Sequence, residues 1–430
     1  MATTSQHLLL SPAELAYLHS TLSLTPPLRP DGRTATQFRP LTAETGILPA
    51  TNGSARVCFA DGTEAVVGVK AEVEKTVNTS IPNEDGQSSR QPRQRRRKQQ
   101  AKDQETTKPE EEEEEEEEDE TGDGEAERRG EDHWLELSVE IPGYRDDDSG
   151  TVFLATMLSE ALLADGELTK KLWINRRFHW KLYLDIILIS PPLSYPLPLL
   201  SLTTHLALLA TRLPRLKSEG DEDPMFDDDW AASRFIYSRS TSSNSTTTST
   251  STSTKTTSNP RPPITLLVMA VGENVIFDPS KEELAVADCA LAVSVGDADA
   301  DADADAEEEV TDAAMDVDVD AEVKGARTLR LLSVRTIDPP SRLTAPGVPN
   351  AVYAAAWGQQ GGGGAAPVAA KETTTTTGLR AAETGSVEGV WKAPRGGSKI
   401  AIISTILEKI LRKGGVADEV LEGLDGVELA

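Results

Sequence analysis

Hydrophobic and polar residues recur along this chain with two different periods, and each period predicts a different kind of element. Near the N-terminus, SPAE at 11–14 combines a capping Ser, a Pro suited to the first helical position and a Glu at capping-box spacing. Leucines at helical spacing follow from Leu15 to Leu22. We therefore expect a helix that ends before Pro26.

Alternation of apolar and polar residues predicts strands in the first half of the chain. Asp61 and Gly62 form a hairpin signal between two of them. The predicted strands are 55–60, 64–73, 135–141 and 180–189, and the predicted helices are 152–163 and 199–213. The second of these helices is apolar nearly all round, which indicates that it is buried.

The second half partly repeats this order of hairpins and helices. Its predicted strands are 264–271, 274–277, 291–295 and 327–334. Its predicted helices are 281–288, one that starts near Ile400 and ends at Gly414, and a short one at 416–424. Because strands pair in hairpins and helices arrive in clusters, the chain is predicted to be α+β with mixed sheets.

Five stretches lack the apolar side chains that would offset the entropy of ordering their backbone. We predict that they are disordered low-complexity segments: 78–133, 217–232, 238–261, 296–324 and 341–388. The first contains a basic run from Arg93 to Lys98 and an acidic run from Glu110 to Glu120. The basic run could be a nuclear import signal, an RNA-contacting arm or a solvated charge run.

Composition narrows the possible functions. The formal net charge of −28 disfavours nucleic-acid binding at first sight, but most of the excess acid lies in the predicted inserts. Two cysteines, Cys58 and Cys289, allow one disulfide at most and no structural zinc site alone, so we expect a reducing compartment. The longest apolar stretch, 193–213, is broken by prolines, a His and an Arg, and residues 1–10 have no basic region. We expect neither a membrane span nor a secretory signal.

Candidate catalytic and metal-ligating residues are scarce. None of the five histidines has a second His or Cys at metal-ligand spacing, and no phosphate-binding loop or nucleophile elbow occurs. His205 lies in the apolar helix and is interpreted as a packed side chain. The acidic triplet 146–148 follows Pro142 and Gly143, where a solvated turn is favoured over a metal site.

An ordered set of short motifs resembles the RNase PH-like proteins, and in particular the RNase PH-like ring subunits of the eukaryotic RNA exosome. The motifs are LRPDGR at 28–33, NGSARV at 52–57, VGVKAE at 67–72, WKLYLD at 180–185, ATRLP at 210–214 and VIFDP at 275–279. The resemblance covers nearly all of the chain outside the predicted inserts.

The resemblance implies an RNase PH-like fold of two β-β-α-β-α-like halves. It divides the chain into an N-terminal helix (1–27), a first half (28–214), an acidic and Ser/Thr-rich linker (215–263) and a second half (264–430). It also implies partners: other RNase PH-like exosome subunits in a hetero-hexameric ring, RNA-binding cap subunits, and single-stranded RNA in a central channel. The nucleus, nucleolus and cytoplasm are the expected locations, without membrane association.

Active members of this family degrade RNA from its 3′ end with phosphate, and this sequence departs from them at two places. The family's phosphate-holding Gly-Gly-Thr-Arg turn corresponds to LSYPLP at 193–198, which has no Arg and two prolines without a backbone donor. The family's Glu-Asp pair corresponds to Glu282-Glu283-Leu284, although a Glu could stand in for the Asp. We therefore predict no catalytic residues, no metal and no cofactor. The alternatives are an active phosphorolytic exoribonuclease and an acidic scaffold that works through its disordered segments.

RNA contact requires cations along a channel, and stacking side chains can add to it. Arg176 and Arg177 stand beside aromatic residues just before a predicted buried strand, so they are the candidate RNA-binding residues. The alternative is an arginine pair at an interface or on the surface. Arg56 and Arg212 could equally be partners in buried ion pairs.

Overall fold

The computed structural model describes residues 10–76, 130–145, 147–218, 220, 222–237, 261–297, 328–337, 391–394 and 397–429. Most of four predicted inserts therefore lies outside the described residues: 78–129, 238–260, 298–324 and 341–388. Among the helices of the described ranges, none is long and apolar enough to cross a bilayer.

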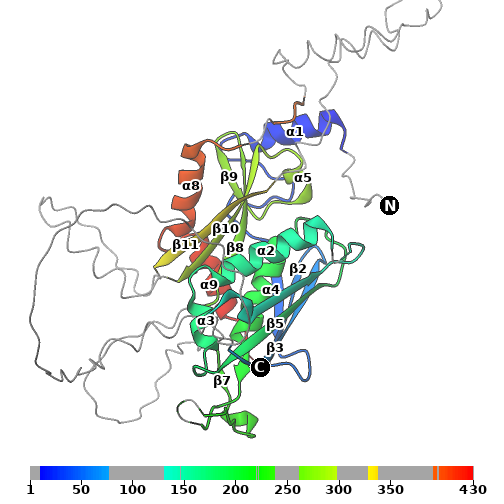
Figure 1. The fold of residues 1–430 in the computed structure, drawn as a ribbon. Helices are drawn as coiled ribbons and strands as arrows, with labels where there is room; N and C mark the ends of the chain where they lie inside the picture. Colours follow the sequence, from blue (N-terminus) through cyan, green and yellow to red (C-terminus); the bar gives the residue numbers. More distant parts are fainter. Residues whose placement is uncertain are drawn as a thin grey trace, which may run out of the picture.

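The first half of the chain forms a five-stranded sheet with the order β1-β2-β3-β5-β4 (Figure 1). Its strands are β1 (Leu41–Thr45), β2 (Gly53–Phe59), β3 (Glu64–Lys75), β4 (Leu135–Glu140) and β5 (Phe178–Leu188). β4 and β5 are parallel, and the other neighbours are antiparallel. The four strands predicted in this half are confirmed as β2, β3, β4 and β5.

The second half forms an antiparallel four-stranded sheet with the order β11-β10-β8-β9. Its strands are β8 (Ile264–Val271), β9 (Asn274–Phe277), β10 (Cys289–Asp297) and β11 (Leu329–Ile337). Every residue of β8 is buried, because both faces of this strand are covered. Helix α5 spans only Lys281–Leu284, shorter than the predicted 281–288.

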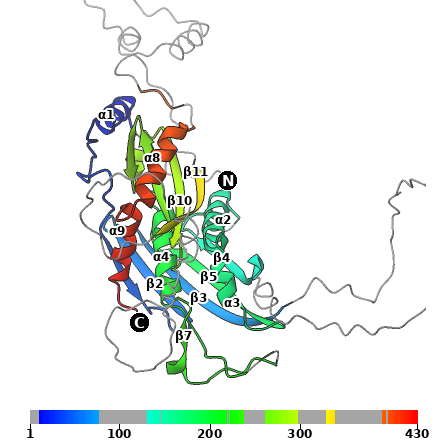
Figure 2. The same ribbon diagram turned by 90° about the vertical axis from the view of Figure 1, so that its left-hand side faces the viewer.

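Helix α4 (Leu197–Leu209) lies between the two sheets and joins them into one hydrophobic core. It contacts β2 and β3 of the first sheet and β8 of the second, and all of its residues are buried. This position explains why its sequence is apolar all round. Two helices, α2 (Ser149–Leu163) and α3 (Glu167–Leu172), follow β4, and α8 (Ile400–Leu411) and α9 (Val416–Asp425) run along the opposite flank (Figure 2).

The N-terminal helix α1 (Pro12–Leu22) covers the outer face of the second sheet, at the top of Figure 1. The predicted capping box is confirmed: the Ser11 hydroxyl accepts from the Glu14 backbone and the Glu14 carboxylate accepts from the Ser11 backbone. Leu15 and Leu22 are buried against a group of apolar side chains that includes Met269 of β8. The N-terminal segment is therefore part of the second half in space.

One predicted disordered stretch, 217–232, is ordered in the structure apart from two residues that are not described. A two-stranded ribbon, β6 (Arg212–Leu213) with β7 (Arg234–Phe235), closes this loop at its base, and a short helix, η2, spans Trp230–Ala232. The Phe226 ring packs 4.9 Å from the Trp180 ring of β5. The prediction of disorder here is wrong, because one aromatic contact anchors an otherwise acidic loop.

Each half contains a hairpin that is followed by helices and further strands, with the order β2-β3-β4-α2-α3-β5-α4 in the first half and β8-β9-α5-β10-β11-α8-α9 in the second. The predicted α+β class with two similar halves is thus confirmed.

Candidate functional site

The segment 193–198 leads into α4, and the resemblance aligns it with the family's phosphate-holding turn. Pro196 is the N-cap of α4 and provides no side-chain hydrogen bond, and Pro198 lies in the first turn. The N–H groups of Leu197 and Leu199 belong to buried residues. A helix N-terminus binds anions through free, accessible N–H groups, so α4 has no such site.

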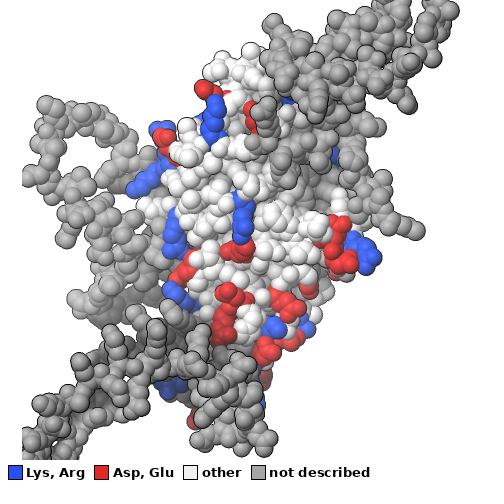
Figure 3. Space-filling model, turned by 45° about the horizontal axis from the view of Figure 1, so that its top comes forward, with Lys and Arg blue, Asp and Glu red and all other residues white. Residues whose placement is uncertain are grey.

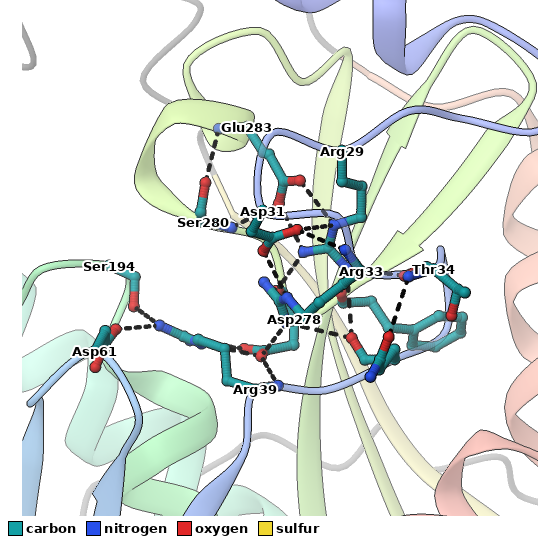
Figure 4. A network of polar contacts seen from close by, with 12 residues as sticks. Arg29, Asp31, Arg33, Thr34, Arg39, Asp61, Ser194, Asp278, Ser280 and Glu283 are labelled. Carbon is teal, nitrogen blue, oxygen red and sulfur yellow. Dashed lines mark hydrogen bonds and ion pairs between the residues drawn. The ribbon is translucent and has the colours of Figure 1, made fainter.

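A guanidinium group from a remote segment reaches this turn. Arg39 Nη1 donates to the Ser194 hydroxyl and to Asp61 Oδ2, both at 2.7 Å (Figure 4). The rest of the Arg39 guanidinium binds Asp278 at the start of the second half. Burial disfavours the charged guanidinium, but its hydrogen bonds to Asp278 and the charges of both carboxylates outweigh this and raise the pKa of Arg39. Two carboxylates therefore already neutralise the cation beside the turn.

Asp278 is the centre of this polar network. Its carboxylate accepts hydrogen bonds from Arg33 Nη1 (2.8 Å), from Arg39 Nη2 (2.6 Å) and from the Arg39 backbone N–H (2.9 Å). Its carbonyl oxygen accepts from Arg29 and Arg33. Asp278 has a positive φ of 46°, which is uncommon for any residue except Gly but tolerated by Asp and Asn.

Glu283, the residue that could replace the family's Asp, is occupied by a structural contact. Its carboxylate forms a bidentate pair with Arg29, with Nε–Oε1 at 2.7 Å and Nη2–Oε2 at 2.8 Å. Both side chains are completely buried, at 0% exposure. Glu283 also forms a capping box with Ser280 at the start of α5. The carboxylate thus accepts three hydrogen bonds from within the chain, two from Arg29 and one from the Ser280 N–H.

Leu284, the next residue along the chain, is buried in the second apolar cluster with α1. Glu282 is exposed on the other side of the turn. Among the residues that the structure describes, no three His, Cys, Asp or Glu side chains are grouped so that they could hold a metal ion.

Arg176 and Arg177 lie on the loop that leads into β5, and both are exposed. The buried Asn175 side chain shapes this loop, because its Oδ1 accepts from the backbone N–H groups of Arg177 (2.9 Å) and Phe178 (2.8 Å). The Arg177 guanidinium also lies 5.4 Å from the centre of the Phe178 ring. Their contact with RNA stays a prediction.

An acidic loop, here the part of residues 217–229 that the structure describes, lies against this arginine loop. Arg177 Nη2 is 3.1 Å from Asp223 Oδ1, and Asn175 Nδ2 donates to the Glu222 carbonyl at 3.0 Å. Both members of the ion pair are more than half exposed, so it contributes little to stability and salt screens it. On the face drawn in Figure 3, Lys and Arg are scattered, several beside acidic groups, around a broad uncharged area.

The other two candidate arginines differ in environment. Arg56 pairs with Glu64 at 2.6 Å and Glu44 at 3.5 Å, but 42% of its side chain is exposed. The predicted ion pair exists, and its predicted burial is wrong because this face of the sheet is open among the described residues. Arg212 lies over the Phe235 ring at 4.3 Å, in the ribbon that closes the acidic loop.

The histidines that are buried have packing roles. His205 is fully buried in α4, and its Nδ1 lies 2.7 Å from the Pro262 carbonyl. Burial lowers the pKa of His205 to about 4, so the ring is neutral at pH 7 and this Nδ1 donates the hydrogen bond. His179 stacks on Trp134 with 4.4 Å between ring centres, and burial lowers its pKa as well. The packed interpretation of His205 is therefore confirmed.

Asp148, in the acidic triplet, caps α2 by accepting from the Gly150 N–H at 2.9 Å. Asp147 pairs with Arg145 at 2.9 Å, and Asp146 lies outside the described residues. The turn interpretation fits these contacts. The two cysteines, Cys58 and Cys289, are not joined to each other.

Sequence reasoning found Glu283 and the turn but missed Arg39 and the central role of Asp278. Arg39 follows the LRPDGR motif by six residues and has no motif of its own, and its partner Asp278 is 239 residues away. The only signal was the presence of Asp278 in the quoted VIFDP motif.

Two curated proteins match the chain over about two thirds of its length. Exosome complex component RRP42 of Saccharomyces cerevisiae is 27% identical over 290 residues, which cover 66% of this chain and 80% of that protein. Exosome complex component rrp42 of Schizosaccharomyces pombe is 26% identical over 301 residues, which cover 66% of this chain and 77% of that protein. No protein-family model matches the chain. The resemblance to RNase PH-like exosome subunits thus agrees with the names of these homologues.

Three solved structures resemble the course of this chain at low sequence identity. An archaeal exosome core chain has 16% identity and a TM-score of 0.41, and the match covers 75% of this chain and 84% of that one. A chain of the Archaeoglobus fulgidus exosome with RNA bound to the active site has 16% identity and a TM-score of 0.40, with 76% and 87% covered. Rice Rrp46 has 12% identity and a TM-score of 0.31, with 62% and 80% covered.

Proposed function

We propose that this chain is a non-catalytic ring subunit of an RNA exosome, which supports 3′-to-5′ processing and degradation of RNA, including maturation of ribosomal RNA. The names of its curated homologues support the exosome assignment. The observation that carries the non-catalytic role is the buried pair between Glu283 and Arg29. It uses the one carboxylate that could have replaced the missing catalytic Asp.

A phosphorolytic centre has to neutralise an incoming phosphate and hold a metal or an acid at the scissile bond. The turn before α4 has prolines where N–H donors are needed, and the neighbouring guanidinium of Arg39 is bound by Asp61 and Asp278. The Glu283 carboxylate, which could stand in for the family's Asp, is bound by Arg29 and by the Ser280 N–H. Both requirements are therefore unmet in this chain.

The non-catalytic role is tested with the purified chain, inorganic phosphate and a short 3′-labelled single-stranded RNA. We expect no release of nucleoside diphosphates above the background of a heat-treated sample, while an active phosphorolytic enzyme in a parallel reaction degrades the same RNA. Release by the chain alone, growing in proportion to its concentration, would show that it is an enzyme.

Ring assembly is tested by affinity purification of the tagged chain and mass spectrometry. We expect five other RNase PH-like subunits and the RNA-binding cap subunits to copurify. The matched control lacks residues 78–129 and 298–324, and it should recover the same partners because the folded halves carry the interfaces. Loss of the partners from the control only would favour the acidic-scaffold alternative.

Arg176 and Arg177 are proposed to contact RNA phosphates in the ring. In reconstituted rings, replacing both with Ala should weaken binding of single-stranded RNA and lower the slope of log affinity against log salt by about 1.4, since each phosphate contact contributes about 0.7. The control is Arg145→Ala, because Arg145 is also exposed and paired with an Asp. Equal behaviour of the two variants would refute the RNA role.

The expected locations are the nucleus, the nucleolus and the cytoplasm. A fluorescent fusion of the full chain, expressed from its own promoter, tests this distribution. Exclusion of the fusion from the nucleus would contradict a role in ribosomal RNA maturation.

A further inference from the structure

We infer that Arg33 and Arg39 form an oxyanion-binding site that the chain fills with its own Asp278 carboxylate. This inference goes beyond the proposed function, because assembly of a ring does not depend on it. The ligand class is a tetrahedral oxyanion such as inorganic phosphate or sulfate. In the native chain the internal carboxylate keeps such anions out (Figure 4).

The donors converge as they do around a bound oxyanion. Two guanidinium groups and one backbone N–H direct four donor groups at the two oxygens of Asp278: Arg33 Nη1, Arg39 Nε, Arg39 Nη2 and the Arg39 N–H, at 2.6 to 3.2 Å. Forked guanidinium donors bind carboxylates and phosphates with the same geometry. The site therefore selects for an oxyanion, and the fold supplies one.

The site is withdrawn from water, which strengthens it. The Asp278 side chain is 1% exposed, and those of Arg33 and Arg39 are 9% and 10% exposed. In such surroundings guanidinium and backbone N–H donors left without an acceptor are costly. Removal of the Asp278 carboxylate should thus create a demand for an external anion.

The arginines keep other anchors when Asp278 is removed, so the donors stay in place. Arg33 Nε binds Asp31 at 2.6 Å. Arg39 Nη1 binds Asp61 and Ser194, and the Arg39 guanidinium lies 4.6 Å from the centre of the Phe59 ring. These anchors lie on segments other than the one that carries Asp278, so a substitution at Asp278 leaves them in place. The vacated site would be preformed.

The backbone at Asp278 permits a suitable variant. Its φ of 46° is accessible to Gly without strain and is tolerated by Asn. Asp278→Gly therefore removes the carboxylate and leaves room for an anion. Asp278→Asn keeps a side chain of the same size that still fills the site and offers a carbonyl oxygen to the donors.

The experiment measures thermal unfolding of the full chain in sodium phosphate and in sodium chloride of equal ionic strength. Three variants are compared with the native chain: Asp278→Gly, Asp278→Asn and Leu267→Ala. Leu267 is buried in the second sheet, so Leu267→Ala creates a cavity that lowers stability without removing a charge, and it controls for the general stabilisation of proteins by phosphate. We expect Asp278→Gly to have a lower Tm in chloride and to regain it in phosphate with a saturable dose dependence. The native chain, Asp278→Asn and Leu267→Ala should gain only the same small, non-saturating shift.

A gain for Asp278→Gly no larger than that for Leu267→Ala would overturn the inference. If Asp278→Gly does not fold in chloride, its refolding yield from urea is measured in both salts. Recovery in phosphate alone supports the site, and failure in both salts overturns it. None of these outcomes bears on whether the native chain releases nucleoside diphosphates, so the proposed function is tested separately.

Discussion

The buried pair between Arg29 and Glu283 should be a large, measurable part of the stability of this chain. The perturbation is Glu283→Gln, which keeps the volume and removes the charge. Gln retains one acceptor oxygen, but its NH2 group would face the donors of Arg29 or of the Ser280 backbone. The Arg29 guanidinium would remain buried without a carboxylate.

The magnitude follows from what the contact contains. Glu283 accepts two hydrogen bonds from Arg29 and one from the Ser280 N–H, and both paired side chains are fully buried. Removing one partner of a buried ion pair destabilises a protein by about 3–5 kcal/mol.

The assay is urea unfolding at pH 7, followed by tryptophan fluorescence, with the midpoint and the slope fitted separately. The control is Glu282→Gln, which changes an exposed neighbour in the same turn and should shift the free energy of unfolding by less than about 0.5 kcal/mol. The reasoning would be refuted if Glu283→Gln and Glu282→Gln unfolded at the same urea concentration with equal slopes.

Two further predictions concern the helix between the sheets and its surroundings. Burial, opposed by the hydrogen bond to Pro262, lowers the pKa of His205 from 6.5 to about 4. Between these pH values the unfolded chain binds one more proton than the folded chain, so the free energy of unfolding should fall by about 3 kcal/mol as the pH drops from 6.5 to 4. The fall should be smaller in His205→Asn, as measured by urea midpoints at each pH. Parallel pH slopes for the two proteins would contradict this. Gly53→Ala should lower the Tm strongly, because the added Cβ would lie 2.5 Å from the Thr211 Cα. Gly423→Ala, where a Cβ on α9 meets no other atom, should raise the Tm slightly. Equal shifts of the Tm in the two variants would argue against a tight contact at Gly53.

The strands and helices were predictable because the local pattern of apolar and polar residues reflects which side chains are buried. The alternation around Val57 and Val67 gave the correct strands, and the all-apolar run gave the buried helix. The helix ends at Leu209, however, and residues 212–213 of the predicted helical range form β6 instead. The loop containing Phe226 was not predictable, since its order depends on the Trp180 ring, which lies elsewhere in the sequence. A charge-rich segment with one aromatic anchor has the composition of a disordered one.

The candidate site was predictable only where its residues fall in one motif. Arg176 and Arg177 were placed correctly on a loop before β5, but their acidic neighbour Asp223 was assigned to a linker. The partner of Glu283 is 254 residues away, and no local pattern specifies such a pair. Long-range charge pairs of this kind therefore become visible only in the structure.

Placement of α1 on the second sheet also sets an order for events during synthesis. Leu15 and Leu22 leave the ribosome early, but the strands that cover them, β8 to β10, are made roughly 250 residues later. At about 5–20 residues per second this delay is on the order of 10–50 s. During that time the apolar side of α1 and the cations of Arg29, Arg33 and Arg39 have no docking partner in the second half. Docking of α1 therefore waits for the second sheet, and a polypeptide truncated before residue 264 would leave its own N-terminal helix undocked.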